Sequence, residues 1–336
     1  MGSGISSANA EEMGATQMGA GIGPVRRATV FGASGFIGRY VVRRLAQQGY
    51  VVRACMRDPV AGAFLKTMGA VGQIAPMRVN LMDSDEALAS AVHGADAVVN
   101  LVGILAPSGS QTFQALQADG AARLAKAAFA AGATSFVQVS ALGADAASKS
   151  EYARSKAAGE AGVRAAFPNA TIIRPSIVIG AEDGFFNRFA QMAAWSPALP
   201  LIGGGLTKFQ PVYVDDVAAA IERAIAYESA KGQTYEAVGP RVYSFRELME
   251  FLLKTIGKHR GLIPIAWPLA EIQGTLMGML PIKLLTRDQV ELLKTDNVGT
   301  GAQGLEALCI QPAAMEAVAP VYLAAYRKGG RFAAPA

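Results

Sequence analysis

Short apolar runs alternate with stretches of helical periodicity through the first half of the chain. The runs predict six β-strands, at residues 28–31, 51–56, 77–80, 97–101, 135–140 and 170–174. Between them apolar positions recur at the spacing of one helix face, most clearly at residues 113–131. Strands that are apolar on both faces and separated by helices are typical of a parallel sheet covered on both sides. The pattern therefore predicts an α/β fold with a doubly wound parallel sheet.

Beyond residue 174 the alternation weakens. One more strand is expected at residues 234–238 and a helix at residues 244–256, in a smaller C-terminal region of mixed and helical structure that spans residues 241–336. Residues 1–24 are rich in Gly, Ala, Ser and Met and fit neither a secretory signal nor an Arg-rich transit peptide. We expect a disordered tail there.

Residues 261–286 are the most apolar part of the C-terminal region. Glu271 is the only charge before Lys283, and three prolines break the segment into short pieces. One interpretation is a further buried helix. The other is an apolar surface that docks on a membrane interface or a partner subunit, because cationic ends and a tryptophan suit an interfacial helix.

Composition excludes several classes of protein. Of the 336 residues 51% are hydrophobic, yet no apolar run reaches about 18 residues, so no membrane-spanning helix is predicted. The net charge is +5, but the basic residues are scattered and no nucleic-acid-binding motif accompanies them, which argues against a nucleic-acid partner. Two cysteines and two histidines are too few for an iron–sulfur cluster or another metal site.

Three glycines, Gly32, Gly35 and Gly38, follow the first predicted strand and open the next helix. A strand, a glycine turn and a helix N-terminus together surround a dinucleotide pyrophosphate with unpaired backbone N–H groups. The spacing is G-x-x-G-x-x-G rather than the generic G-x-G-x-x-G, and the alternative is an ordinary β–α turn. The flanking strand and helix favour nucleotide binding by a domain at residues 25–240.

A second candidate site consists of Ser140, Tyr152 and Lys156. Tyr-x-x-x-Lys places both side chains on one helix face, where the ammonium group is expected to lower the pKa of the phenol. The tyrosine could then exchange a proton with a hydroxyl or carbonyl group, and the serine could hydrogen-bond a developing oxyanion. The alternative is a solvated helix face, but the position after the fifth strand favours the site.

The end of the second strand decides between NADH and NADPH. NAD-preferring sites place an acidic residue there to accept the ribose hydroxyls. Here Arg57 occupies this end, and it could pair with a 2′-phosphate together with Arg39. The alternatives are two surface arginines, or a one-residue shift that brings Asp58 near the ribose. We predict NADPH.

The glycine motif, Asn100, Ser140, Tyr152 and Lys156 together resemble the extended or atypical short-chain dehydrogenases/reductases. The resemblance implies a Rossmann fold with Ser140, Tyr152 and Lys156 in the catalytic positions, where they can be vestigial. The residues implied for cofactor binding are Gly32, Ser34, Gly35, Phe36, Ile37, Gly38, Arg39, Arg57, Asn80, Leu101, Val102, Gly103, Tyr152 and Lys156.

A narrower resemblance extends beyond this core. Residues 100–103, 152–160, 167–168, 210–214, 286–290 and 304–306 resemble the NADPH-binding accessory subunits of respiratory complex I from mitochondria and alphaproteobacteria. In that family the protein lies on the peripheral arm, near the membrane and the quinone-binding region, and its NADPH is not in the electron path. The resemblance implies other complex I subunits and membrane lipid as partners. It places the protein on the cytoplasmic side of a bacterial inner membrane, or on the matrix side in a mitochondrion.

Two other functions stay open. An independent NADP(H)-dependent reductase, dehydrogenase or sugar-nucleotide epimerase would use Tyr152 as acid and base, Lys156 as its partner and Ser140 as the oxyanion donor. A nucleotide-sensing regulator would bind a partner according to the cofactor ratio. Fold alone does not choose among them. Residues 261–332, which an ordinary reductase would not need, favour the accessory subunit, whose nucleotide would stabilise the folded state.

Overall fold

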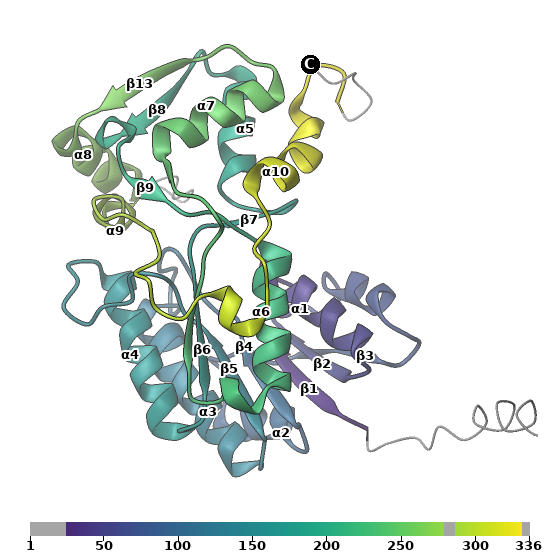
Figure 1. The fold of residues 1–336 in the computed structure, drawn as a ribbon. Helices are drawn as coiled ribbons and strands as arrows, with labels where there is room; N and C mark the ends of the chain where they lie inside the picture. Colours follow the sequence, from purple (N-terminus) through teal and green to yellow (C-terminus); the bar gives the residue numbers. More distant parts are fainter. Residues whose placement is uncertain (1–24, 279–285, 331–336) are drawn as a thin grey trace, which may run out of the picture.

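The computed structural model describes residues 25–278 and 286–330. Within them the core is a seven-stranded sheet in the order β11-β6-β5-β4-β1-β2-β3, and all neighbouring strands run parallel (Figure 1). The strands are β1 (Arg27–Phe31), β2 (Val51–Met56), β3 (Ile74–Arg78), β4 (Ala97–Asn100), β5 (Ser135–Val139), β6 (Thr171–Pro175) and β11 (Thr234–Ala237). The predicted parallel sheet is confirmed. The expected N-terminal tail and residues 279–285 of the apolar segment lie outside the described residues.

The strand predicted at residues 77–80 lies at Ile74–Arg78 instead. β3 is one of the two edge strands, and of its five residues only Ile74 is buried, so the continuous apolar run typical of inner strands is absent. Asn80 belongs to a turn after the strand, where its backbone N–H and its side-chain amide donate to the Asp83 carboxylate at 3.0 and 2.7 Å. The polar groups of Asn80 are therefore engaged in this turn.

Helices cover both faces of the sheet, as a doubly wound fold requires. On one face lie α1 (Phe36–Gln47) and α6 (Val214–Ala226), which pack against each other. On the other face lie α2 (Asp85–Val92), α3 (Gly120–Ala130) and α4 (Glu151–Ala166). The helix predicted at residues 113–131 begins as a π-helical turn, Gln114–Asp119, and continues as α3.

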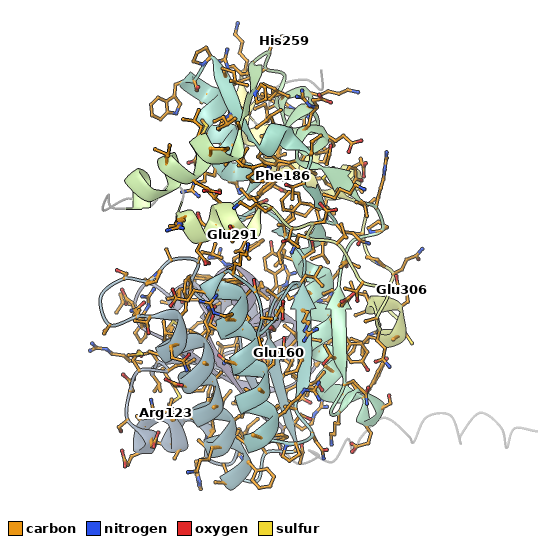
Figure 2. The ribbon with its side chains drawn as sticks, turned by 90° about the vertical axis from the view of Figure 1, so that its left-hand side faces the viewer. Arg123, Glu160, Phe186, His259, Glu291 and Glu306 are labelled. Atoms are coloured by element: carbon orange, nitrogen blue, oxygen red, sulfur yellow. The ribbon has the colours of Figure 1, made fainter. Side chains whose placement is uncertain are left out.

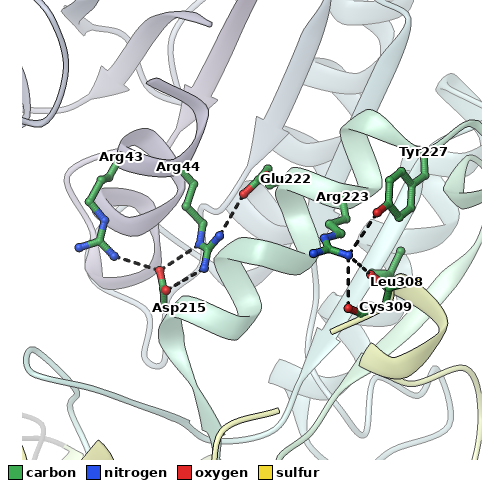
Figure 3. Close-up of polar contacts among 8 residues, drawn as sticks. All are labelled: Arg43, Arg44, Asp215, Glu222, Arg223, Tyr227, Leu308 and Cys309. Carbon is green, nitrogen blue, oxygen red and sulfur yellow. Dashed lines mark hydrogen bonds and ion pairs between the residues drawn. The ribbon is translucent and has the colours of Figure 1, made fainter. Parts of the chain in front are cut away.

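Arginines hold α1, which carries the glycine turn at its start, against α6. Arg44 donates to the two carboxylate oxygens of Asp215 at 3.0 and 2.7 Å and to Glu222 at 3.1 Å (Figure 3). Arg43 adds a further bond to Asp215 at 3.0 Å. The bidentate contact is the strongest geometry that a guanidinium and a carboxylate form.

A second lobe lies beyond the carboxyl ends of the sheet strands (Figure 1). Its helices are α5 (Phe186–Trp195), α7 (Phe245–Ile256) and α10 (Met315–Leu323). Its strand pairs are β7 (Val178–Ile179) with β10 (Val212–Tyr213), β9 (Lys208–Phe209) with β12 (Tyr243–Ser244), and β8 (Ala198–Ile202) with β13 (Gly261–Ile265). The helix predicted at residues 244–256 is α7, which Ser244 and Glu247 begin with a reciprocal capping box. Aromatic rings fill the core of this lobe.

The described part of the apolar segment forms β13 and α8 (Trp267–Gly278), and α9 (Arg287–Leu292) follows the segment directly. In the part of it whose side chains the structure describes, Ala270 is buried, but Leu269 and Ile272 are each 59% exposed and Ile263 is 56% exposed. The interpretation as one more buried helix is wrong for this part. The described part of the segment exposes apolar side chains.

After α9 the chain returns to the first lobe. Asn297 accepts a hydrogen bond from the Ser176 hydroxyl at 2.7 Å, and Thr300 donates to the Glu236 carboxylate at 2.7 and 2.8 Å. Arg223 of α6 then donates to the carbonyl groups at residues 308 and 309, at 3.1 and 3.2 Å (Figure 3). The chain finally crosses to the second lobe as α10, so each lobe contains residues from both sides of position 240.

Candidate functional site

The carboxyl ends of β1, β4 and β5 lie side by side, and each leads directly into a predicted site residue. Gly32 follows β1, Leu101 follows β4 and Ser140 follows β5. Open α/β sheets bind their ligands beyond the carboxyl ends of the strands. The structure therefore brings the glycine turn and the serine to one edge of the sheet.

Backbone geometry gives the glycine turn its shape. Gly32 has a φ of +79°, which favours glycine, and its carbonyl oxygen accepts a hydrogen bond from the Gly35 N–H at 3.0 Å. A Cβ atom at Gly38 would overlap the Gly32 carbonyl and lie 2.6 Å from the Ala33 carbonyl oxygen. Gly35 is the N-cap of α1, so no side chain caps the helix and its first N–H groups can bind an anion. The same turn and the start of α1 contain Ser34, Phe36 and Ile37.

The loop after β4 passes beside this turn and contains Leu101, Val102 and Gly103. A Cβ atom at Gly32 would lie 3.3 Å from the carbonyl carbon of Leu101. Asn100 is fully buried and orders the loop, because its side-chain oxygen accepts a hydrogen bond from the Val102 N–H at 3.1 Å. Its amide group donates to Gln138 at 2.9 Å.

Ser140 and Lys156 occupy the buried part of the site. Ser140 is 4% exposed, and its hydroxyl has no hydrogen-bond partner within the part of the chain that the structure describes. Lys156 is 6% exposed, and its Nζ donates to the carbonyl of Val139 at 3.4 Å. Burial lowers the pKa of Lys156 to about 8, although the Glu160 carboxylate acts in the opposite direction.

Tyr152 lies one helical turn before Lys156 on α4. Phe113 packs edge-on against its ring at a centroid distance of 5.9 Å, and Lys156 Nζ lies 5.8 Å from the ring centroid. Burial, together with the Asp288 carboxylate, raises the pKa of Tyr152 to about 12. The expectation that this pKa is lowered is therefore wrong, because both desolvation of the phenolate and the charge of Asp288 raise it. At neutral pH the phenol is protonated and can donate a hydrogen bond.

Gln117, which no sequence pattern predicted as a site residue, lies in the π-helical turn before α3. Its amide group donates to the Ser155 hydroxyl at 2.9 Å, while its side-chain oxygen is buried without a partner among the described residues. A Cβ atom at Gly103 would lie 3.3 Å from this oxygen and 3.2 Å from Lys156 Nζ, so both groups face the loop after β4. π-turns occur frequently at functional sites, but no spacing rule in the sequence marks this one.

Asp288, on α9, also reaches the site and was not predicted. Its carboxylate accepts hydrogen bonds from the backbone N–H of Glu151 at 2.7 Å and of Tyr152 at 3.2 Å. The Ser150 hydroxyl donates to it at 2.9 Å. In the sequence, residues 286–290 stand out only through the family resemblance, since no local pattern places α9 beside α4.

The residues predicted to select the cofactor lie at the rim. Arg57 follows β2 and is exposed, with one guanidinium nitrogen 3.4 Å from the side-chain oxygen of Gln111. Arg39 forms an ion pair with Glu182 at 3.0 Å. One carboxylate oxygen of Asp58 accepts the backbone N–H groups of residues 60 and 61 at 2.9 and 3.1 Å. Asp58 thus closes its own turn.

These observations fit a bound nicotinamide dinucleotide. Because Gly35 caps α1 without a side chain, the first N–H groups of this helix are available to an anionic pyrophosphate. The unpaired oxygen atoms of Ser140 and Gln117 offer hydrogen-bond partners to a polar ligand, since buried polar groups are rarely left unsatisfied. When bound, such a nucleotide supplies a transferable hydride.

In residues 25–278 and 286–330, no group of three or more His, Cys, Asp and Glu side chains could hold a metal ion. In the same described ranges, no helix combines the length and the apolar character that crossing a bilayer needs.

Comparisons with known proteins give both a fold family and close relatives. The model of the NAD dependent epimerase/dehydratase family matches residues 28–237. The Arabidopsis thaliana mitochondrial NADH dehydrogenase (ubiquinone) 1 alpha subcomplex subunit 9 is 37% identical over 316 residues, which cover 90% of this chain and 78% of that protein. A Caulobacter vibrioides ceramide reductase is 37% identical over 195 residues, 57% of this chain and 58% of that protein.

Solved structures agree with the fold. The dTDP-glucose 4,6-dehydratase of Streptomyces venezuelae, solved with NAD and TYD bound, has a TM-score of 0.62 and 25% sequence identity to this chain. The superposition covers 71% of this chain and 84% of that protein. The match supports a Rossmann-type nucleotide fold of the short-chain dehydrogenase/reductase kind.

Proposed function

This chain belongs to the alpha subcomplex subunit 9 family of NADH:ubiquinone oxidoreductase, within the NAD dependent epimerase/dehydratase family, and on this premise we propose that it is a nucleotide-binding accessory subunit of that complex. The observation that carries the proposal is the extent of the similarity. It covers 90% of the chain and therefore includes residues beyond 237, where the epimerase family model ends. The two cysteines of the chain give it no means to ligate an iron–sulfur cluster, which suits a subunit outside the electron path.

The nucleotide that we propose is NADPH, held mainly as a structural group. Asp58 supports this choice, because its carboxylate already accepts two N–H groups of its own turn, while Arg57 is exposed at the end of β2. The glycine turn would hold the pyrophosphate, and Tyr152, Lys156, Ser140 and the loop at residues 101–103 would surround the nicotinamide half. Bound this way, the nucleotide would stabilise both the sheet edge and α4 by mass action.

We propose that the second lobe makes the contacts with other complex I subunits and with membrane lipid near the quinone site. The exposed apolar side chains of Ile263, Leu269 and Ile272 support this assignment, because a docking site needs apolar surface that the chain itself does not bury. The corresponding location is the cytoplasmic side of a bacterial inner membrane, or the matrix side of the mitochondrial inner membrane in a eukaryote.

Native gel electrophoresis of mildly solubilised membranes tests the subunit assignment. The chain is detected beside an in-gel NADH dehydrogenase stain. We expect it to migrate with a large NADH-oxidising band, and the variant Tyr152→Phe to migrate with the same band because assembly needs no catalysis. Migration of the wild-type chain as a small soluble species would contradict the proposal.

Calorimetric titration of Arg57→Ala tests the cofactor. We expect NADPH to bind about 10-fold more weakly, because a charge-assisted contact to the 2′-phosphate contributes about 1.5 kcal/mol or more. The affinity for NADH should stay within about twofold on the same reasoning. Arg241→Ala, which removes an arginine side chain that is 69% exposed and pairs with Glu316 of α10, is the matched control. Equal losses for both nucleotides would contradict the assignment of the 2′-phosphate to Arg57.

An independent NADP(H)-dependent reductase is the second candidate function. The relative named a ceramide reductase favours it, as does the presence of Ser140, Tyr152 and Lys156 around one edge of the sheet. NADPH oxidation by a long-chain ketone substrate, lost in Tyr152→Phe, would support this function. No turnover with such ketones, from a protein that binds NADPH, would exclude that substrate class.

A further inference from the structure

α9 lies between the first lobe, which is the lower lobe in Figures 1 and 2, and the second lobe, which is the upper lobe there. It packs into the upper lobe. Its residue Val290 is fully buried in a small apolar cluster with Ile202 of β8 and Ala270 of α8. Just past the helix, Lys294 forms an ion pair with Glu271 of α8 at 2.7 Å. Figure 2 shows Glu291, on α9, between the upper lobe with Phe186 and the lower lobe with Glu160. The position of α9 therefore depends on its contacts with the upper lobe.

The opposite side of α9 caps α4. The N–H groups of Glu151 and Tyr152 belong to the first turn of α4 and have no partner inside the helix. Asp288 accepts both, and it also accepts the hydroxyl of Ser150. Ser150 in turn caps the N–H of Ala153 at 3.3 Å. The start of the helix that carries Tyr152 and Lys156 is thus completed by a carboxylate from a distant part of the chain.

A second contact joins α9 to the other segment that lines the site. The side-chain amide of Gln289 donates to the backbone carbonyl of Leu105 at 3.3 Å. Leu105 lies in the loop after β4, two residues past Gly103. One short helix therefore contacts both the first turn of α4 and the loop after β4.

We propose that α9 couples the nucleotide site to the upper lobe, with Asp288 as the positioning residue. A nucleotide that orders α4 and the loop after β4 also orders the contacts of Asp288 and Gln289, so α9 becomes more firmly seated. By thermodynamic linkage, lifting α9 from the lower lobe weakens nucleotide binding, and the factor equals the one by which the nucleotide favours the seated position of α9. The inference rests on the nucleotide binding proposed above, and it makes that binding responsive to what the upper lobe contacts.

Hydrogen–deuterium exchange of the full chain, with and without NADPH, tests the coupling in the unaltered protein. We expect NADPH to slow exchange in peptides that cover the glycine turn and also in those that cover residues 286–293. Slowed exchange at the glycine turn with unchanged exchange at residues 286–293 would overturn the coupling and leave the proposed nucleotide binding intact. Unchanged exchange in both regions would overturn nucleotide binding itself, and the coupling with it.

Two alanine variants on α9 separate the role of Asp288 from a general effect on the helix. Asp288→Ala removes the cap, and we expect NADPH to bind about 5-fold more weakly and to lose its effect on exchange at residues 286–293. Glu291→Ala removes a carboxylate whose partner is Lys294, and it should bind NADPH as the wild type does. Equal NADPH affinity in the two variants would refute the role of Asp288.

Discussion

At the scale of single residues, the site is built from groups that destabilise the fold by themselves. The side-chain oxygen atoms of Ser140 and Gln117 are buried without partners in the described structure, and Lys156 is a buried ammonium group. Each unsatisfied buried polar group costs about 1–3 kcal/mol. Residues of this kind often occur at functional sites, which supports the nucleotide position proposed above.

Replacing Lys156 tests this cost. Because its pKa falls from 10.5 to about 8 on folding, the folded state binds fewer protons than the unfolded state between these pH values. The penalty is full below pH 8 and disappears as the pH rises towards 10.5, so this residue makes stability increase over that window. We expect Lys156→Met to raise the free energy of unfolding at pH 7, by up to about 3 kcal/mol, and to abolish NADPH binding.

Urea unfolding of both proteins at pH 7, 8 and 10 provides the measurement. The difference between variant and wild type should shrink as the pH rises. A variant that is less stable than the wild type at pH 7 would show that the buried charge of Lys156 does not lower the free energy of unfolding.

The glycine turn permits a matched pair of substitutions. Gly38→Ala places a methyl group against two backbone carbonyls, so we expect the free energy of unfolding to fall by about 1–3 kcal/mol and NADPH binding to be lost. Gly184→Ala is the control, because a Cβ atom there meets no atom within 4 Å. Thermal unfolding and NADPH titration of both variants check this. Normal binding by Gly38→Ala would mean that the close approach of α1 to the turn is unnecessary.

At the scale of elements, the attachment of α1 to α6 keeps the start of α1 in place. Burial alone would raise the pKa of Asp215, but the hydrogen bonds and charges of Arg44 and Arg43 outweigh it and hold this pKa below its ordinary range. The stabilisation is therefore fully present above the ordinary pKa of about 4 and is lost as the pH falls through the lower, folded-state value.

Asp215→Asn should remove this stabilisation. We expect a loss of about 1–3 kcal/mol at pH 7, because the half-buried guanidinium of Arg44 keeps only part of its hydrogen bonds. On acidification the variant should lose less further stability than the wild type. Asp85→Asn breaks an ion pair whose carboxylate is 75% exposed, and its effect should stay within about 0.5 kcal/mol. Denaturant titrations at pH 7 and pH 3 compare the two, and equal effects would contradict the role of the α1–α6 contact.

At the scale of the whole molecule, the second lobe is tied to the first at several points and still exposes apolar side chains. Leu269 and Ile272 are each 59% exposed on α8, and Trp195 is 86% exposed at the end of α5. These residues are not needed for packing within the chain. Their exposure is the physical reason to expect a partner on this lobe.

The double substitution Leu269→Gln and Ile272→Gln tests that expectation. In the isolated protein the free energy of unfolding should change by less than about 0.5 kcal/mol per site, because the side chains are exposed. Incorporation into the large NADH-oxidising band should fall several-fold. Val321→Gln, at a residue of α10 that is 75% exposed, serves as the control. Full incorporation of the double variant would place the interface elsewhere.

Local pattern determined much of this protein from the sequence alone. Apolar runs and helical spacing predicted the parallel sheet, with the largest error at edge strand β3, where only Ile74 is buried and the apolar signal is weak. The glycine spacing and Tyr-x-x-x-Lys placed candidate residues correctly on a turn and on one helix, because such geometry depends on residues close together in the chain.

Only the tertiary structure decided what surrounds those residues. Asp288 bonds the backbone of Tyr152 across 136 positions of sequence, and Gln117 is buried against a helix 38 positions away. The pKa of Tyr152 rises rather than falls for the same reason. Desolvation and long-range contacts depend on how the lobes pack, and local sequence spacing does not specify that packing.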